Sequence, residues 1–292
     1  MGLVLSILVA LLWSLFDVIR KKSVKLISEI KVLLIIVISQ SIFFLIFLLF
    51  SDFFLVLSSY FFLAILLIFL NFISMYLFLK VLKSGAISTF IPMLSFTPLF
   101  SGLYSNLILN ETLLYIQYLG MVFILIGTFL LHANNKKISN VIKSPWIILE
   151  YRNSFLIILV ALIWSLTPVL DKKSLQYCDL YLHGFIQSIG MLLILPFFFK
   201  ENLFKEIKFL SNKVIKNYLL YFLIIISFIC SFLQLITLKF IFVAELETLK
   251  RSIGIIMSLF FGYYYFHEKI NYMKIFSVFL ILVGVINITI FT

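Results

Sequence analysis

The stretch ALLWSLFDVIRKKS at residues 10–23 returns as ALIWSLTPVLDKKS at residues 161–174, with nine of the fourteen positions identical. The two copies begin 151 residues apart, which is close to half of the 292-residue chain. Chance rarely gives such a match, even in a very apolar chain. The repeat therefore predicts two homologous halves, each of which opens with a Trp-Ser helix that ends in Lys-Lys-Ser.

The composition predicts an integral membrane protein. Hydrophobic residues make up 64% of the chain and charged residues 12%, whereas a soluble domain has roughly 45–50% apolar and about 25% charged residues. Val32–Phe50 and Leu113–Leu131 each run for nineteen residues without a charge. A bilayer core of about 30 Å is crossed by roughly 20 apolar residues in a helix, so runs of this length are typical of membrane spans.

Ten membrane spans are predicted, and all should be helices because a helix satisfies its own backbone in lipid. The fold class is thus an all-α integral membrane protein with two five-helix repeats, residues 1–134 and 155–292, joined by a loop at 135–154. A short interfacial helix is expected within the polar connection 200–217. The spans are 2–19, 32–50, 55–79, 86–109, 113–131, 155–170, 181–199, 218–238, 242–266 and 271–291.

The ends of the two halves also correspond. Asn110-Glu111 precedes the fifth span and His267-Glu268 precedes the tenth, while Gly127 and Gly284 keep the same offset of 157 residues. With an odd number of spans in each half, the halves must insert with opposite topology, as an inverted repeat. Glu111 and Glu268 are interpreted as structural residues that interact with the N-terminal dipole of the helix that follows each.

The basic residues predict an orientation in the membrane. Of the 23 Lys and Arg residues, 18 fall in the odd-numbered connections, and the positive-inside rule places these connections in the cytoplasm and both termini outside. The net charge of +11 therefore orients helices and does not predict nucleic-acid binding. The expected location is the cell (inner) membrane, as a multi-pass protein. Cys178 and Cys230 are expected to be unpaired thiols.

The repeated Trp-Ser helix, the ten spans and the Glu before spans five and ten resemble the drug/metabolite transporter superfamily, in its EamA-like branch. Thr248–Ser252, Gly262 and Phe266–Lys269 are similar to that family's ninth-helix pattern. The resemblance covers essentially the whole chain, and it implies a ten-helix bundle with a central cavity that works by alternating access. Members usually keep both termini in the cytoplasm, so the Lys and Arg count departs from the family.

Helix nine carries the densest set of intramembrane charges, Glu245, Glu247, Lys250 and Arg251. Each costs about 2.5–3.5 kcal/mol at a helix centre on insertion scales and is a functional candidate by default. One interpretation is a self-neutralised patch, because the charges sum to zero and Glu247 precedes Arg251 by four residues, a favourable spacing for an ion pair.

The other interpretation of helix nine is an anion site. Adjacent Lys250 and Arg251 point about 100° apart, so one can pair with Glu247 while the other faces a pore. The pair resembles the ninth-helix Lys-Arg with which plastid triose-phosphate-type transporters of the same superfamily hold phosphate. Those proteins add a lysine in helix four, and the segment 86–109 here carries none.

Helix one offers a different chemistry. Trp13 and Asp17 share a face and could bind an ammonium group by charge and cation–π attraction; alternatively, Asp17 pairs with Arg20 or Lys21 at the membrane interface. His183 is interpreted as a satisfied interfacial residue, with a proton relay as the alternative. The remaining polar or aromatic candidates for substrate binding are Asn71, Ser95, Trp164, Gln187 and Gln234.

The predicted function is secondary transport of a small polar metabolite, such as an amino acid or a carboxylate, with a proton or a counter-substrate as the candidate coupling partner. The alternatives are an organic-phosphate exchanger that uses Lys250-Arg251, and a membrane-embedded lipid-head-group enzyme or assembly factor. The sequence holds no enzyme motif, phosphate-binding Gly loop or His/Cys metal cluster, so no catalytic residue, metal or cofactor is expected. Substrate identity, direction, coupling ion and oligomeric state are left open.

Overall fold

The structure is a computed structural model that describes residues 1–84, 90–91, 93–132, 152–198, 217–267 and 272–289. Each predicted span overlaps one of the α-helices given below, and the described part contains no strand. Residues 200–216 of the connection in which an interfacial helix is predicted lie outside the described residues, and so does Glu268. The elements are α1 (Gly2–Leu26), α2 (Glu29–Leu49), α3 (Leu57–Ser84), α5 (Phe96–Leu109), α6 (Tyr115–His132), α8 (Arg152–Ser174), α9 (Leu180–Ile194), the 3-10 helix η1 (Leu195–Phe198), α11 (Tyr218–Thr237), α12 (Val243–Phe266) and α13 (Tyr272–Thr289).

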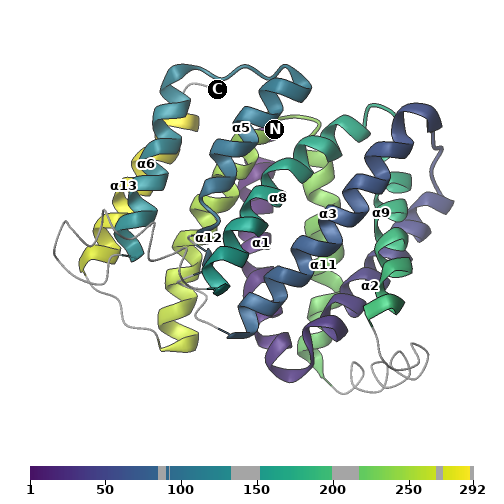
Figure 1. The fold of residues 1–292 in the computed structure, drawn as a ribbon, viewed down its shortest axis with the longest axis horizontal. Coiled ribbons are helices and arrows are strands. Elements are labelled where there is room, and N and C mark those ends of the chain that lie inside the picture. Colours follow the sequence, from purple (N-terminus) through teal and green to yellow (C-terminus); the bar gives the residue numbers. More distant parts are fainter. Residues whose placement is uncertain (85–89, 92, 133–151, 199–216, 268–271, 290–292) are drawn as a thin grey trace.

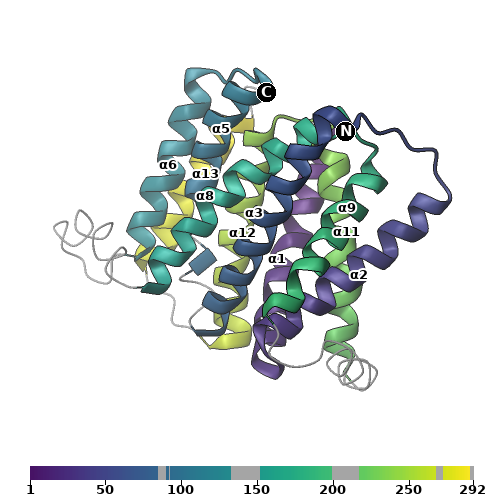
Figure 2. The ribbon, with the colours of Figure 1, turned by 45° about the vertical axis from the view of Figure 1, so that its right-hand side comes forward.

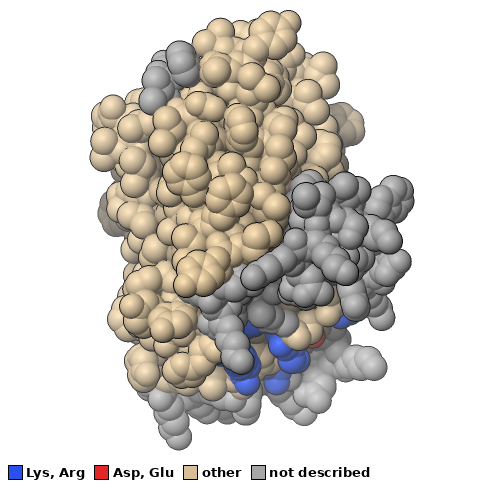
Figure 3. Space-filling view, turned by 90° about the vertical axis from the view of Figure 1, so that its left-hand side faces the viewer, with Lys and Arg blue, Asp and Glu red and all other residues tan. Residues whose placement is uncertain are grey.

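The polarity of the bundle is that of a protein in lipid. Among the described residues, six helices are long and apolar enough to cross a membrane: α1, α2, α3, α8, α9 and α11. On α1, exposed Val4, Leu8, Leu11 and Leu15 follow one face, whereas the buried residues include Asp17 and other polar side chains. Figure 3 shows a broad face whose described atoms are almost all uncharged, with Lys and Arg gathered near one end.

Two helices differ from their predicted bounds for an identifiable reason. α1 continues to Leu26 instead of ending near residue 19, because Arg20 is ion-paired with Asp17 and so remains inside the bundle. The span 86–109 is interrupted by a turn at Leu94–Ser95, and α5 begins only at Phe96. Pro98 has no backbone N–H, so it cannot bond the Leu94 carbonyl; Thr97 N and Thr97 Oγ1 both donate to this carbonyl instead, at 2.9 Å.

The corresponding helix ends of the two halves share an uncommon backbone conformation. Asn110 follows α5 with φ 58°, and His267 follows α12 with φ 53°. They are the two non-glycine residues with positive φ in the described part of the chain. Asn and His tolerate this left-handed region better than most residues do. The offset of 157 residues that the sequence showed is thus accompanied by the same local geometry.

The most extensive contacts between helices are related by exchange of the two halves. α1 packs against α11 and α12, and its counterpart α8 packs against α3 and α5, their counterparts. α2 packs against its own counterpart α9, and α6 against its counterpart α13. α1 begins and α13 ends at one end of the bundle, and α6 ends at the other (Figures 1 and 2).

Close backbone approach joins α6 and α13 at one edge of the bundle (Figure 1). A methyl group on Gly120 would lie 2.5 Å from the Gly284 carbonyl oxygen, and one on Gly127 would lie 2.8 Å from the Ser277 carbonyl oxygen. The higher residue number on α6 meets the lower number on α13, so the two helices run antiparallel. Small residues permit this approach, which supports helix association where no hydrophobic driving force acts.

Replacement of Gly120 by alanine is expected to lower the free energy of unfolding. The clash is with backbone atoms, which cannot move aside, and overpacking of this kind costs about 1–3 kcal/mol, more than the gain of about 1 kcal/mol that alanine gives over glycine in a helix. Thermal unfolding in detergent measures the change. Gly254→Ala is the control, since among the described residues its methyl group would meet only Ile91 Cγ2, at 3.7 Å; an equal loss in both variants would contradict the packing account.

Candidate functional site

A cavity lies between the two halves of the chain, the first half being α1 to α6 and the second α8 to α13. Its empty volume is about 1100 Å³, including the part that is open to solvent. The charged side chains that line it are Asp17, Arg20, Asp171, Lys250 and Arg251, and its walls carry further hydroxyl, amide and imidazole groups. A concave site lined by a few polar and charged groups in this way is suited to a small polar solute.

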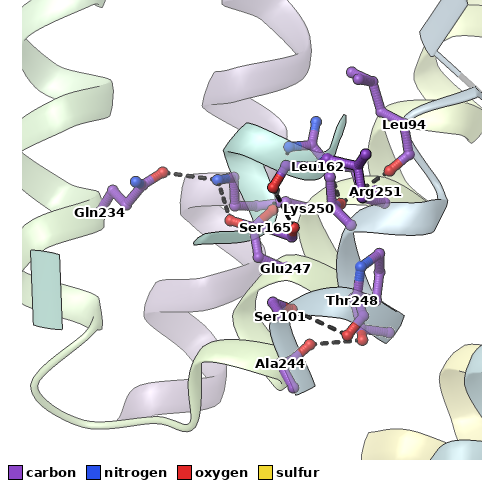
Figure 4. A network of polar contacts seen from close by, with 12 residues as sticks. Leu94, Ser101, Leu162, Ser165, Gln234, Ala244, Glu247, Thr248, Lys250 and Arg251 are labelled. Carbon is purple, nitrogen blue, oxygen red and sulfur yellow. Dashed lines mark hydrogen bonds and ion pairs between the residues drawn. The ribbon is translucent and has the colours of Figure 1, made fainter. Parts of the chain in front are cut away.

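One carboxylate holds the two cations of α12. Lys250 Nζ donates to Glu247 Oε1 at 2.6 Å, and Arg251 Nη2 donates to Glu247 Oε2 at 3.2 Å. Glu247 is 0% exposed, whereas both cations line the cavity. Lys250 also reaches Gln234 Oε1 on α11 at 2.8 Å (Figure 4). Glu247, Lys250 and Arg251, called the α12 trio below, therefore carry a formal charge of +1 beside the cavity.

The break before α5 positions a partner for Arg251. Arg251 Nε donates to Thr97 Oγ1 at 2.7 Å, while this hydroxyl donates to the Leu94 carbonyl. Arg251 is thereby fixed between its own helix and the first turn of α5. Ser95, a sequence candidate in the same turn, is buried but does not line the cavity.

The two repeated tryptophans stand against the protein's own cations. The ring centroid of Trp13 lies 5.4 Å from Arg20 Cζ and 4.9 Å from Lys250 Nζ. Its counterpart Trp164 lies 5.8 Å from Arg20 Cζ and 5.4 Å from Arg251 Cζ. Two aromatic rings, one from each half, thus connect three cations by cation–π contacts. The neighbouring serines bond the carbonyls three residues back, Ser14 to Leu11 and Ser165 to Leu162.

Asp17 is already paired inside the bundle. Arg20 Nη2 donates to Asp17 Oδ1, and Arg20 is 0% exposed. The pairing alternative for Asp17 therefore holds, and the pair lies in the cavity wall. Because Arg20 and Lys250 occupy positions near Trp13, an ammonium site made by Trp13 and Asp17 finds no support in this arrangement.

A second polar cluster lies where α8 ends and α9 begins. His183 Nε2 is 3.2 Å from Asp171 Oδ1, and His183 Nδ1 is 2.8 Å from Tyr60 Oη. Asp171 and His183 line the cavity and are almost fully buried. The interpretation of His183 as a satisfied residue is correct in that both ring nitrogens have partners, but its position is the cavity wall.

Hydrogen bonds at the same end of the bundle join the two halves. Lys172 Nζ and the amide of Val243 donate to the two Glu111 oxygens at 2.6 and 2.9 Å. Glu111 thus caps α12, not the helix that follows it as expected, because α6 begins only at Tyr115. Nearby, Leu55 and Cys178 form an isolated β-bridge. Burial raises the pKa of the Cys178 thiol to about 12, and both cysteines are free, as predicted.

Eight of the ten sequence candidates line the cavity: Trp13, Asp17, Asn71, Trp164, Gln187, Gln234, Lys250 and Arg251. Glu247 lies behind the two cations, and Ser95 lies apart. Sequence reasoning missed Arg20, Gln40, Asp171 and Ser231 as lining residues. The repeat held a signal for two of them, because Arg20 and Asp171 occupy equivalent positions in the two copies.

Several buried polar atoms near the cations have no hydrogen-bond partner among the described residues. They include Trp13 Nε1 and Arg20 Nε, both of which are donors, and Gln187 Oε1. All three side chains line the cavity. Buried donors are normally satisfied, so unpaired N–H groups beside a cavity are suited to a ligand that supplies acceptor oxygens.

The comparisons with known proteins agree with the resemblance seen in the sequence. The family model described as the EamA-like transporter family matches residues 1–133 and 152–290. A solved structure, whose title is only "Crystal structure of protein", is similar in fold with a TM-score of 0.70 at 15% identity, over 99% of this chain and 96% of that chain. No curated protein matches the chain.

Replacement of Glu247 by glutamine is expected to lower the free energy of unfolding by about 3 kcal/mol or more, because it leaves two buried cations without a carboxylate. Thermal unfolding in detergent gives the value. Glu29→Gln is the matched control: Glu29 pairs with Lys83 at the surface, where an ion pair is worth about 0–1 kcal/mol. The double variant Glu247→Gln/Lys250→Gln should recover part of the loss, and a further loss instead would contradict this charge balance.

Proposed function

Since the chain belongs to the EamA-like transporter family, and is thus a multi-pass membrane protein of a transporter family and not of an enzyme family, we propose that it is a secondary transporter of a small solute that carries a carboxylate, such as an amino acid. The solute binds in the cavity between the halves and is moved by alternating access. The protein acts in the cell (inner) membrane, with all ten helices spanning it.

The observation that carries this proposal is the charge of the α12 trio. Lys250 and Arg251 share one carboxylate, so a formal charge of +1 remains in a buried wall. A carboxylate on the solute compensates this charge, and Arg matches carboxylate geometry with two parallel N–H groups. The unpaired N–H groups of Trp13 and Arg20 offer further donors.

The other cavity groups favour an amino acid over a simple carboxylate. Asp171 lines the same cavity, and none of the described Lys and Arg side chains forms a salt bridge with it. A solute ammonium group could therefore pair with it. An organic phosphate remains the second candidate because Lys250 and Arg251 also suit phosphate, with Arg20 as a third cation, although this one is already paired with Asp17.

The inverted repeat is part of the proposal, and the α6–α13 contact supports it. With the offset of 157 residues, Gly120 corresponds to Ser277 and Gly127 corresponds to Gly284. Gly120 contacts Gly284, and the equivalent contact between Ser277 and Gly127 is also present. Two antiparallel helices related in this way have a pseudo-twofold axis perpendicular to them, which is an axis in the membrane plane. Residues 1–134 and 155–292 would then be the units that rock during transport.

Ligand-induced stabilisation tests the substrate class. Purified protein is heated with amino acids, dicarboxylates, phosphate esters and quaternary amines. A true ligand at a hundred times its Kd adds about 2.7 kcal/mol, which raises Tm by several degrees. We expect stabilisation by amino acids that is lost in Lys250→Gln/Arg251→Gln and kept in Lys239→Gln, a control at an exposed lysine. Stabilisation by phosphate esters alone would favour the exchanger, and by amines alone would remove the anion site.

Cysteine labelling tests the opposite orientation of the halves. Ser84, at the end of α3, and Lys239, just after α11, occupy corresponding connections and are both exposed. In a background without Cys178 and Cys230, cysteines at these positions are expected to react with a membrane-impermeant maleimide from opposite sides, Lys239→Cys on intact cells and Ser84→Cys only after lysis. Labelling of both cysteines from the same side would refute the inverted repeat. If Ser84→Cys reacts on intact cells and Lys239→Cys only after lysis, both termini lie in the cytoplasm.

A further inference from the structure

One titratable cluster in the cavity wall has no role in the proposed binding of the solute's carboxylate. Asp171 is in the last turn of α8, His183 in the first turn of α9 and Tyr60 in the first turn of α3. Their exposed fractions are 8%, 1% and 2%. The imidazole stands between the other two groups, with Nε2 3.2 Å from the carboxylate and Nδ1 2.8 Å from the phenol oxygen.

We propose that Asp171 and His183 form a proton-binding site that exchanges a proton for the ammonium group of the solute, so that transport is a proton antiport. This inference rests on the proposed transport function, and it names the coupling ion and the residues that bind it.

The hydrogen bonds allow His183 to gain and lose a proton with both ring nitrogens satisfied. In the neutral ring, Nε2–H donates to the Asp171 carboxylate and Nδ1 accepts from the Tyr60 hydroxyl. When a proton from cavity water binds to Nδ1, this N–H donates to the Tyr60 oxygen, and the hydroxyl proton turns away. The reverse step returns the proton from Nδ1 to water. No bond to carbon changes, and no other reactant is needed.

The surrounding charges give the site its affinity for a proton. Lys172 lies next to Asp171 in the chain but donates to Glu111 and to the Ile241 carbonyl. Asp179 caps α9 through the amide of Tyr181, and the buried Cys178 thiol lies beside Tyr60. From α2, the uncharged ring of Phe44 packs beside Gly184, and the cavity residues of α11 are uncharged.

The described groups thus provide Asp171 with no cation other than His183. A buried carboxylate without a counter-charge is costly, and protonation of His183 converts the pair into an ion pair. A solute ammonium group supplies the same positive charge. The proton and the ammonium group therefore compete for one carboxylate, which makes their binding mutually exclusive and is the condition for antiport.

The proton site can be tested by NMR without any substrate. The chain has three histidines, His132, His183 and His267, so His132→Gln/His267→Asn leaves His183 as the only one. Asn suits residue 267 because it tolerates the left-handed backbone there. With isotope-labelled histidine, we expect the ring to bind one proton reversibly, and Asp171→Asn to weaken this binding because it removes the carboxylate that accepts from Nε2. A ring that never titrates, or an unchanged affinity in Asp171→Asn, would overturn the site.

Coupling is tested in vesicles that hold the protein and an entrapped pH-sensitive dye, with a mixture of the standard L-amino acids as the probe. Entry of amino acids is expected to raise the internal pH in the wild type. In His183→Gln, the exchange of labelled for unlabelled amino acid should persist, while the pH change falls at least tenfold. His267→Asn is the matched control and should behave as the wild type. If His183→Gln loses the exchange, the NMR comparison of the wild-type residue pair with Asp171→Asn, which needs no substrate, decides whether the proton site exists.

The outcomes separate the two proposals. Amino-acid exchange without a pH change in the wild type refutes the proton coupling and leaves the transport function standing. Absence of exchange in the wild type refutes the amino-acid transporter, and with it the antiport, even where NMR finds the proton site.

Discussion

The Glu247 carboxylate holds two cations inside a bundle whose surface is apolar. Its two oxygens accept from Lys250 and from Arg251, and its own exposure is zero. In a medium of low dielectric constant, each of these charges would be prohibitive alone. Because one carboxylate serves two cations, the group is stable and yet carries a positive charge beside the cavity. The proposed preference for a carboxylate follows from this imbalance.

The third cation that lines the cavity, Arg20, and the two tryptophans are arranged around this group. Trp13 and Trp164, which occupy equivalent positions in the two repeats, both lie beside Arg20, and each also contacts one cation of α12. The duplication thus places the same aromatic residue on both sides of a single charged centre. The two copies of the fourteen-residue stretch differ at the charged positions of the cavity: Asp17 corresponds to Pro168, and Arg20 corresponds to Asp171. A symmetric scaffold consequently encloses an asymmetric cavity, with cations on one wall and the Asp171–His183 pair on another.

Much of the fold could be predicted from the sequence because membrane insertion depends on local composition. Runs without charge gave the helices, and the repeat gave the correspondence between halves, which the left-handed Asn110 and His267 then matched in geometry. The helix ends were less predictable. α1 runs on to Leu26 because Arg20 is paired inside the bundle, and the break before α5 depends on Pro98 together with the hydrogen bonds of Thr97.

The sequence by itself determined that the chain spans a membrane and that Glu247 can reach Lys250 and Arg251, since both depend on residues a few positions apart. It also determined that the chain is duplicated, since the two copies of the repeat can be compared directly. Tertiary structure alone decided that Arg20 and Asp171 face the cavity, that Thr97 holds Arg251, that Glu111 caps α12, and that His183 bridges Asp171 and Tyr60. The partners in most of these contacts lie more than 100 positions apart. Helical periodicity reports which residues share a face, but which neighbour that face meets is fixed only when the helices pack.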